Sequence, residues 1–191
     1  MPSRWLTTFV GWQRLMERDF THLRPVLEAY YGSFVSLTRS IQAMDKQLAE
    51  REKQDQRAAR LQTIPRVGRI ASLTFLAAVG DVHRFASSRK LVSYAGLCPT
   101  VRSSGERTEY GSISRAGRSE LRAVWVQIAH LVARDTDRST ARLRKWYSRV
   151  AHHRGKKTAL VALARKLLMI AYRLLYDQTE YRSSLVSRKA A

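Results

Sequence analysis

The sequence is poor in acidic residues and in cysteine. It has 191 residues, with 15 Asp and Glu against 35 Lys and Arg, which gives a formal net charge of +20. The single cysteine, Cys98, cannot form an internal disulfide, which fits a reducing compartment. Nucleic acid is the usual partner of so basic a chain, although a membrane surface or a ribosome attracts the same charge. Charge therefore indicates a polyanionic partner and no particular chemistry.

Signals of membrane and secreted proteins are also missing. The most apolar run, 159–176, carries Arg165, Lys166 and Arg173 where the bilayer core would lie, so we expect a buried or partner-facing helix and no membrane partner. The first ten residues hold one arginine and no sustained apolar core. We therefore expect no signal peptide.

The patterns of metal sites and of common phosphate-binding loops are absent too. The five histidines and one cysteine show no ligand spacing, and the acids form no cluster suited to two-metal phosphoryl chemistry. The run Gly155-Lys-Lys-Thr158 lacks the first glycine and the preceding strand of a P-loop. We therefore predict no metal ligand. We do predict nucleic-acid contacts at Arg154, Lys156 and Lys157, around the start of a helix.

What the sequence does contain is mostly helical periodicity. Over residues 1–56 we expect a helical arm, interrupted near Pro25 and possibly at Gly32. Four of its apolar residues form a heptad-like seam, with spacings of four, three and four: Leu37, Ile41, Met44 and Leu48. The seam is typical either of a coiled coil, which would make a homo-oligomer through residues 37–48, or of a helix packed on its own domain.

The middle of the chain resembles a helix-hairpin-helix element. A helix ending at Gln62, the turn 64–68 and a helix over 69–79 would turn backbone amides and a helix N-terminus toward a phosphate. Arg66, Gly68 and Arg69 are the candidate binding residues. The alternative is a plain connection between two helices.

Residues 99–117 have little helical character. They are expected to form two short strands or an extended loop, after which Ser112 or Ser114 would cap the next helix. Two further helices are expected over 140–152 and 156–177. The predicted fold is therefore all-α. It has a helical arm (1–56), a bundle-like domain (57–181) with a helix-hairpin-helix-like element and an irregular or short β-hairpin loop, and a basic disordered tail (182–191).

Serines among arginines are the candidates for chemistry. A hydroxyl attacks a phosphodiester when its proton is removed and cations or amides neutralise the phosphorane charge. Capping or phosphate hydrogen bonding is the alternative role for each serine, and spacing alone does not choose a nucleophile. The serines of this region are Ser103, Ser104, Ser112 and Ser114, and the arginines around them are Arg102, Arg107, Arg115, Arg118 and Arg122.

An ordered set of motifs resembles the C-terminal domain of transposases of the IS110/IS116/IS902 family. The set covers about residues 57–181. Its members are Ile64-Pro65-x-Val67-Gly68, Gly80-Asp81 with Arg84-Phe85, Leu91-x-x-Tyr94-Ala95-Gly96-Leu97-x-Pro99, Ser104-Gly105, Gly111-x-Ile113-Ser114-Arg115-x-Gly117-x-x-x-Leu121-Arg122, Gly155-Lys156-Lys157 and Ala162-x-Ala164-Arg165-Lys166-Leu167-Leu168.

The resemblance implies a subunit of a bacterial DNA recombinase in the cytoplasm, associated with the nucleoid. Family members combine a RuvC-like domain that binds a divalent metal, a coiled coil and a domain whose serine becomes linked to DNA, and a structured RNA guides them. By position Ser104 is the implied nucleophile, with Ser103 and Ser114 as alternatives. No cofactor is expected within this chain, because magnesium would be bound by the RuvC-like domain.

Two departures from the family pattern bear on function. Arg66 replaces the usual glycine of the turn, and a strand-borne acidic set of the RuvC type is missing. We therefore expect a DNA-binding transposase part that is inactive in recombination alone. The alternatives are a non-catalytic nucleic-acid-binding module, a decayed remnant of a transposase, and a structural RNA-binding protein.

Overall fold

The computed structural model describes residues 9–16, 23–104 and 107–182, with only the backbone described at residues 9, 13, 15, 16 and within 101–110. The chain divides into two compact units, residues 1–49 and 50–191. Sequence analysis placed the division after residue 56. Gly105, which follows the candidate nucleophile, and nearly all of the expected tail lie outside the described residues.

The first unit consists of α1 (Phe9–Met16) and most of α2 (Arg24–Gln54). The ring of Trp12 packs against Tyr31 and Phe34, at centroid distances of 6.0 and 6.1 Å. Pro25 lies in the first turn of α2, where its missing N–H costs no helical hydrogen bond. The helix continues through Gly32, so the interruption predicted there is wrong.

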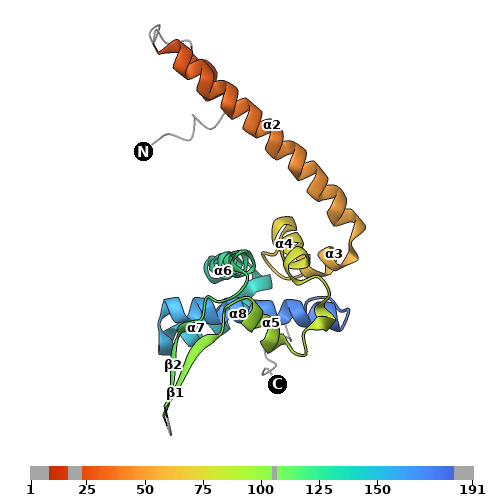
Figure 1. Cartoon of the computed structure of the whole chain (residues 1–191), viewed down its shortest axis with the longest axis vertical. Coiled ribbons are helices and arrows are strands. Elements are labelled where there is room, and N and C mark those ends of the chain that lie inside the picture. The colour runs from red at the N-terminus through yellow and green to blue at the C-terminus, as the bar shows by residue number, and fades with distance from the viewer. Residues whose placement is uncertain (1–8, 17–22, 105–106, 183–191) are drawn as a thin grey trace. The chain divides into compact units, whose positions relative to one another are not determined.

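Helices form nearly all of the second unit, which confirms the predicted all-α class (Figure 1). Two short 3-10 turns, η2 (Val82–Arg84) and η3 (Arg138–Thr140), join some of them. After the end of α2 the helices are α3 (Gln56–Gln62), α4 (Arg69–Val79), α5 (Ser88–Tyr94), α6 (Ser119–Arg134), α7 (Ala141–Arg154) and α8 (Lys156–Tyr176).

Local sequence signals fix several of these helix ends. Ser87 caps α5 by accepting a hydrogen bond from the Lys90 amide. Gly80 and Gly96 follow α4 and α5 at φ of 64° and 68°, a left-handed conformation that glycine adopts readily. Ordinary capping chemistry therefore accounts for the ends of α4 and α5.

The core of the second unit is built around α8. Ten residues of this helix are buried, which explains its apolar run. Trp125 of α6 and Phe75 of α4 are fully buried and pack edge to face, with centroids 5.8 Å apart. Among the helices that the structure describes, none combines the length and apolar character needed to cross a bilayer.

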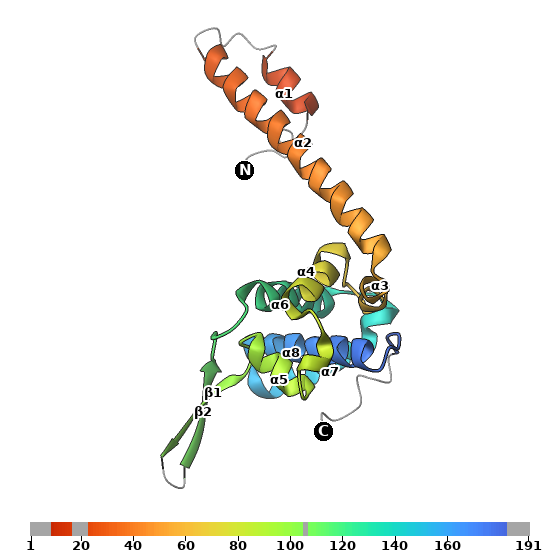
Figure 2. The ribbon, with the colours of Figure 1, turned by 45° about the vertical axis from the view of Figure 1, so that its right-hand side comes forward.

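A two-stranded antiparallel sheet joins α5 to α6. Strand β1 (Pro99–Ser104) pairs with β2 (Arg107–Ile113), with Ser103 opposite Thr108 and Ser104 opposite Arg107. Of the two expected forms, strands or an extended loop, the structure therefore contains strands. Both views show the strands projecting away from the helices of this unit (Figures 1 and 2).

The start of α6 differs from expectation. Ser112 belongs to β2 and Ser114 directly follows it, whereas α6 begins at Ser119. The prediction that one of these serines caps the helix is therefore wrong. The reason is a loop in which Arg115 and Gly117 have φ of 54° and 145°, values that an α-helix cannot contain. Arg118 occupies the N-cap position without a side-chain capping bond.

Candidate nucleic-acid interface

The implied nucleophile lies at the distal end of the sheet. Ser104 is the last residue of β1, and Arg102 and Ser103 precede it on the same strand. Arg107 lies opposite Ser104 at the start of β2. The backbone pairing therefore places both arginines that flank the serines in sequence at the same end of the sheet as the serines.

The alternative nucleophile, Ser114, lies at the other end. Its amide donates to the Cys98 carbonyl at 2.8 Å, next to the first residue of β1. Five residue steps separate Pro99 from Ser104, about 17 Å along an extended strand. Arg115 and Arg118 follow Ser114 at the base of the sheet. The structure therefore separates these two arginines from Ser104, although the sequence grouped all of them around one site.

The base of the sheet is a tight junction between α5 and α6. The Arg118 amide donates to the Tyr94 carbonyl at 3.0 Å, and the Arg115 amide donates to the Gly96 carbonyl at 3.3 Å. A Cβ at Gly117 would lie 2.3 Å from the Tyr94 carbonyl oxygen, closer than any side chain permits. Glycine at this position therefore lets the two segments meet.

Two arginines predicted to clamp phosphate are bonded to this junction. Arg118 donates from Nε to the Tyr94 hydroxyl at 2.9 Å. This bond, more than the weaker bond from Arg84, holds the pKa of Tyr94 below its usual range, against the opposing effect of burial. Arg122 donates to the carbonyls of Ala95 and Arg115 at 3.2 and 3.1 Å. Both guanidinium groups thus serve the fold.

The predicted phosphate grip at 64–68 also contains a paired arginine. Arg66 forms a bidentate ion pair with Asp135, with both N to O distances at 2.5 Å. The hydrogen bond from Arg66 is the largest cause that lowers the pKa of Asp135. Arg66 has φ of 68°, a left-handed conformation in which a side chain costs about 1 kcal/mol.

The start of α4 contains the other two predicted phosphate-binding residues of the turn, Gly68 and Arg69. Gly68 is its N-cap, makes no side-chain capping bond and has open space around its Cβ position. Arg69 donates from Nε to the Glu52 carboxylate, and this bond is the main cause that lowers the pKa of Glu52. The helix N-terminus is therefore open to an approaching group, whereas the guanidinium next to it already contacts an acid.

The remaining predicted cations are exposed around the start of α8. Arg154 ends α7, Gly155 turns the chain at φ of 80°, and Lys156 and Lys157 begin α8. Both lysines line a cavity together with three polar residues that sequence analysis missed: His130, Arg134 and Tyr147. The i, i+4 spacing of His130 and Arg134 placed them on one helix face, but nothing in the sequence indicated that α7 and α8 face them.

The described ranges of the chain contain no candidate metal-binding site. No group of three or more His, Cys, Asp or Glu side chains comes together there. The acids of the second unit that interact with arginines, such as Asp135 and Glu52, do so in pairs.

Comparison with known proteins places these residues in a family. Residues 58–147 match the family described as Transposase IS116/IS110/IS902. The match begins in α3 and ends within α7. It therefore includes the turn at 64–68, the junction, the sheet and all of α6.

Several individual proteins are similar over most of this chain. The transposase of insertion element IS1111A from Coxiella burnetii is 32% identical over 160 residues, covering 84% of this chain and 44% of its own length. The IS1328 transposase of Yersinia enterocolitica is 30% identical over 146 residues, covering 76% and 43%. A pilin gene-inverting protein of Moraxella bovis is 36% identical over 118 residues, covering 61% and 36%.

This chain thus matches less than half the length of each of these relatives. The segment that matches the family contains Gly96, Gly117, Tyr94 and the candidate serines Ser103, Ser104 and Ser114. We conclude that the chain belongs to the IS116/IS110/IS902 family of transposases.

Proposed function

We propose that this chain is the DNA-binding C-terminal part of an insertion-sequence transposase, in which Ser104 attacks a DNA phosphodiester. The observation that carries the proposal is the position of Ser104 at the distal end of a projecting strand pair, within the segment that matches the family. A nucleophile presented in this way can reach a DNA strand without displacing the helical core. Ser103 and Ser114 are the alternatives.

The proposed step exchanges one phosphoester bond for another. The bond from Ser104 Oγ to phosphorus forms as the bond to one bridging oxygen of the DNA backbone breaks. The serine proton passes to a base, and the departing oxygen takes up a proton. Arg102 and Arg107 share the distal end of the sheet with Ser104, so they are the proposed groups that neutralise the pentavalent transition state.

The rest of the reaction centre is proposed to come from elsewhere in the recombination complex. A RuvC-like domain would supply the divalent metal, and a structured RNA would select the DNA. The described residues contain no group of side chains that could hold a metal ion. The proposed reaction centre is therefore composite, with Ser104 on this chain and the metal on the RuvC-like domain. On this account the 191 residues alone bind DNA but do not recombine it.

The seam on α2 is the proposed contact to a second copy. Leu37, Ile41 and Met44 are 64%, 60% and 64% exposed, although all three are apolar. The structure describes every residue of α2, and none of them is buried. A paired coiled coil would cover this seam and bring two recombinase subunits together.

Replacing each candidate serine in the complete complex tests the nucleophile. Ser104→Ala should reduce strand exchange by at least about 10³-fold with unchanged DNA binding, and no protein-linked DNA should form. Ser103→Ala and Ser114→Ala are the matched controls and should retain covalent linkage. Normal strand exchange and normal DNA binding by Ser104→Ala would remove Ser104 from the chemistry.

The proposed oligomer is tested by a substitution in the seam and by a control substitution at the adjacent residue. Ile41→Asp should shift the chain to monomer in sedimentation velocity, because a charge would lie in the seam. Gln42→Asp introduces the same charge beside the seam and should leave the oligomer intact. Sedimentation of the unmodified chain as a monomer at all concentrations would reject the proposal.

A further inference from the structure

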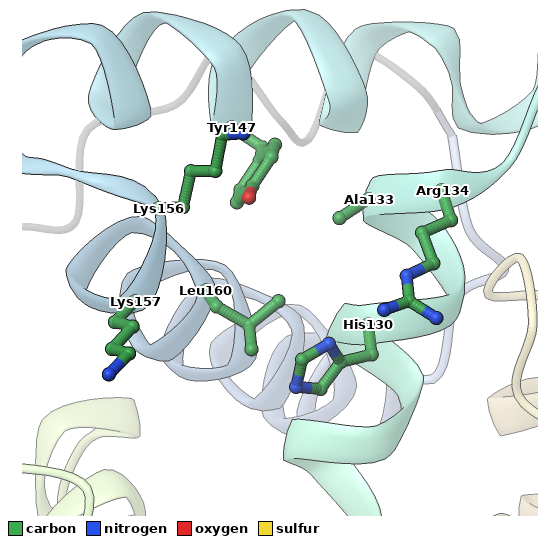
Figure 3. A pocket seen from close by; sticks show the side chains of 7 residues that line it. All are labelled: His130, Ala133, Arg134, Tyr147, Lys156, Lys157 and Leu160. Carbon is green, nitrogen blue, oxygen red and sulfur yellow. The ribbon is translucent and has the colours of Figure 1, made fainter.

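An open cavity lies among the end of α6, the middle of α7 and the start of α8. Its volume is about 470 Å³, within the range of pockets that hold small organic ligands. Figure 3 shows seven lining side chains around the opening. They are His130, Ala133, Arg134, Tyr147, Lys156, Lys157 and Leu160.

The cavity is basic, and its cations are not paired. The lining includes one arginine and two lysines and no carboxylate. Within the described part of the chain, Arg134, Lys156 and Lys157 take part in none of the ion pairs. The acid next in sequence, Asp135, is held by Arg66. The positive charge around the cavity is therefore available to an anionic ligand.

Its walls are chemically divided. His130 and Arg134 lie one helical turn apart on α6, and Figure 3 shows both on the same side of the opening. On the other side the Tyr147 hydroxyl points into the opening and Lys156 extends along its rim. Leu160 lies between the two sides, and the Lys157 ammonium is directed away from the opening. A ligand that fits must carry a negative group beside an apolar or aromatic face.

We propose that this cavity receives one unstacked nucleotide of a DNA strand. Its phosphate is bound by Arg134 and Lys156, and its base packs on the ring of Tyr147 and on Leu160. A phosphate alone leaves the ring and the leucine without a role, whereas a nucleotide has both required parts. Aromatic stacking with a base is tolerant of sequence and adds to the phosphate contacts.

This inference rests on the proposed DNA binding and adds a second contact region to it. Arg118 and Arg134 are the residues just before and at the end of α6, so the junction and the cavity lie about 24 Å apart along the helix. Seven base pairs of duplex have about the same length. The cavity is therefore a contact for the strand at a distance from the junction.

Binding of a short single-stranded DNA with 2-aminopurine at one position tests the inference on the purified 191-residue chain. Tyr147→Ala should weaken binding roughly five- to hundredfold and reverse the quenching of 2-aminopurine, whereas Tyr147→Phe, which keeps the ring, should resemble the unmodified chain. Arg134→Ala should weaken binding about tenfold and lower the salt slope by about 0.7.

Lys157→Ala is the matched control for charge. It removes one cation from the lining of the same cavity, but the ammonium points away from the opening, so its effect should be clearly smaller than that of Arg134→Ala. Circular dichroism of each variant checks that the fold is retained. Equal effects of the two charge variants would overturn the inference, and so would normal binding by Tyr147→Ala.

The controls also separate this inference from the proposed function. If the unmodified chain binds DNA and the cavity variants bind equally well, only the cavity assignment fails. If the unmodified chain binds no DNA, the proposed function fails with it. Variants that lose binding to RNA of the same length while keeping normal DNA binding would also overturn the assignment.

Discussion

Two groups of cations differ in how the protein uses them. At the turn and the junction, Arg66 and Arg69 contact carboxylates, and Arg118 and Arg122 hold a hydroxyl and two carbonyls. At the start of α8, Lys156 and the neighbouring Arg134 line a cavity without acidic partners. The difference shows that the fold itself can occupy a basic residue, even in a chain with a net charge of +20.

The junction should be the most sensitive point of the fold. Gly117→Ala places a Cβ against the Tyr94 carbonyl at a φ of 145°, so it should destabilise the domain by about 3 kcal/mol or more. Denaturant unfolding measures the change. Gly68→Ala is the control, because that position has open space and a φ of −104°; its cost should stay below about 1 kcal/mol. Equal costs would mean that the junction is not as tight as described.

Arginine substitutions should then separate stability from binding. Arg122→Ala leaves two carbonyls without their donor and should lower the free energy of unfolding by about 1–3 kcal/mol, with little change in DNA affinity below the melting temperature. Arg134→Ala should instead weaken DNA binding and leave the free energy of unfolding nearly unchanged. Thermal melts and DNA titrations on both variants measure the two effects, and loss of DNA affinity without loss of stability in Arg122→Ala would break the comparison.

The pair of Arg66 and Asp135 should give a smaller, pH-dependent effect. Because the pKa of Asp135 is lowered in the folded state, its contribution to stability is present above the ordinary carboxyl pKa of about 4 and is lost as pH falls through the lowered value. Asp135→Asn should remove this part of the acid dependence of the melting temperature.

The same substitution frees the Arg66 guanidinium. DNA affinity should therefore rise by less than about tenfold, since one cation becomes available for a phosphate. Arg66→Gly/Asp135→Asn is the control and should lose that gain. A fall in affinity on Asp135→Asn alone would show that the paired arginine already binds DNA.

Sequence patterns were sufficient for most of the helices. The helix over 69–79 was predicted with its observed bounds, because Gly68 and Gly80 flank a mainly apolar segment. The start of α6 was missed, since the left-handed conformation of Arg115 depends on the junction and not on local propensity. The candidate site was also only partly predictable from the sequence. The motifs located the serines, but hydrogen bonding in the folded state decides which arginines are occupied.

The salt dependence of binding to single-stranded DNA tests the central claim most directly. Two double variants remove equal charge: Arg134→Ala/Lys156→Ala from the cavity, and Arg118→Ala/Arg122→Ala from the junction. The cavity variant should lower the magnitude of the log–log slope by about 0.7, the value for one phosphate of a single strand, while the junction variant, measured below its melting temperature, should keep the slope of the unmodified chain. A slope lowered in the junction variant and unchanged in the cavity variant would contradict it.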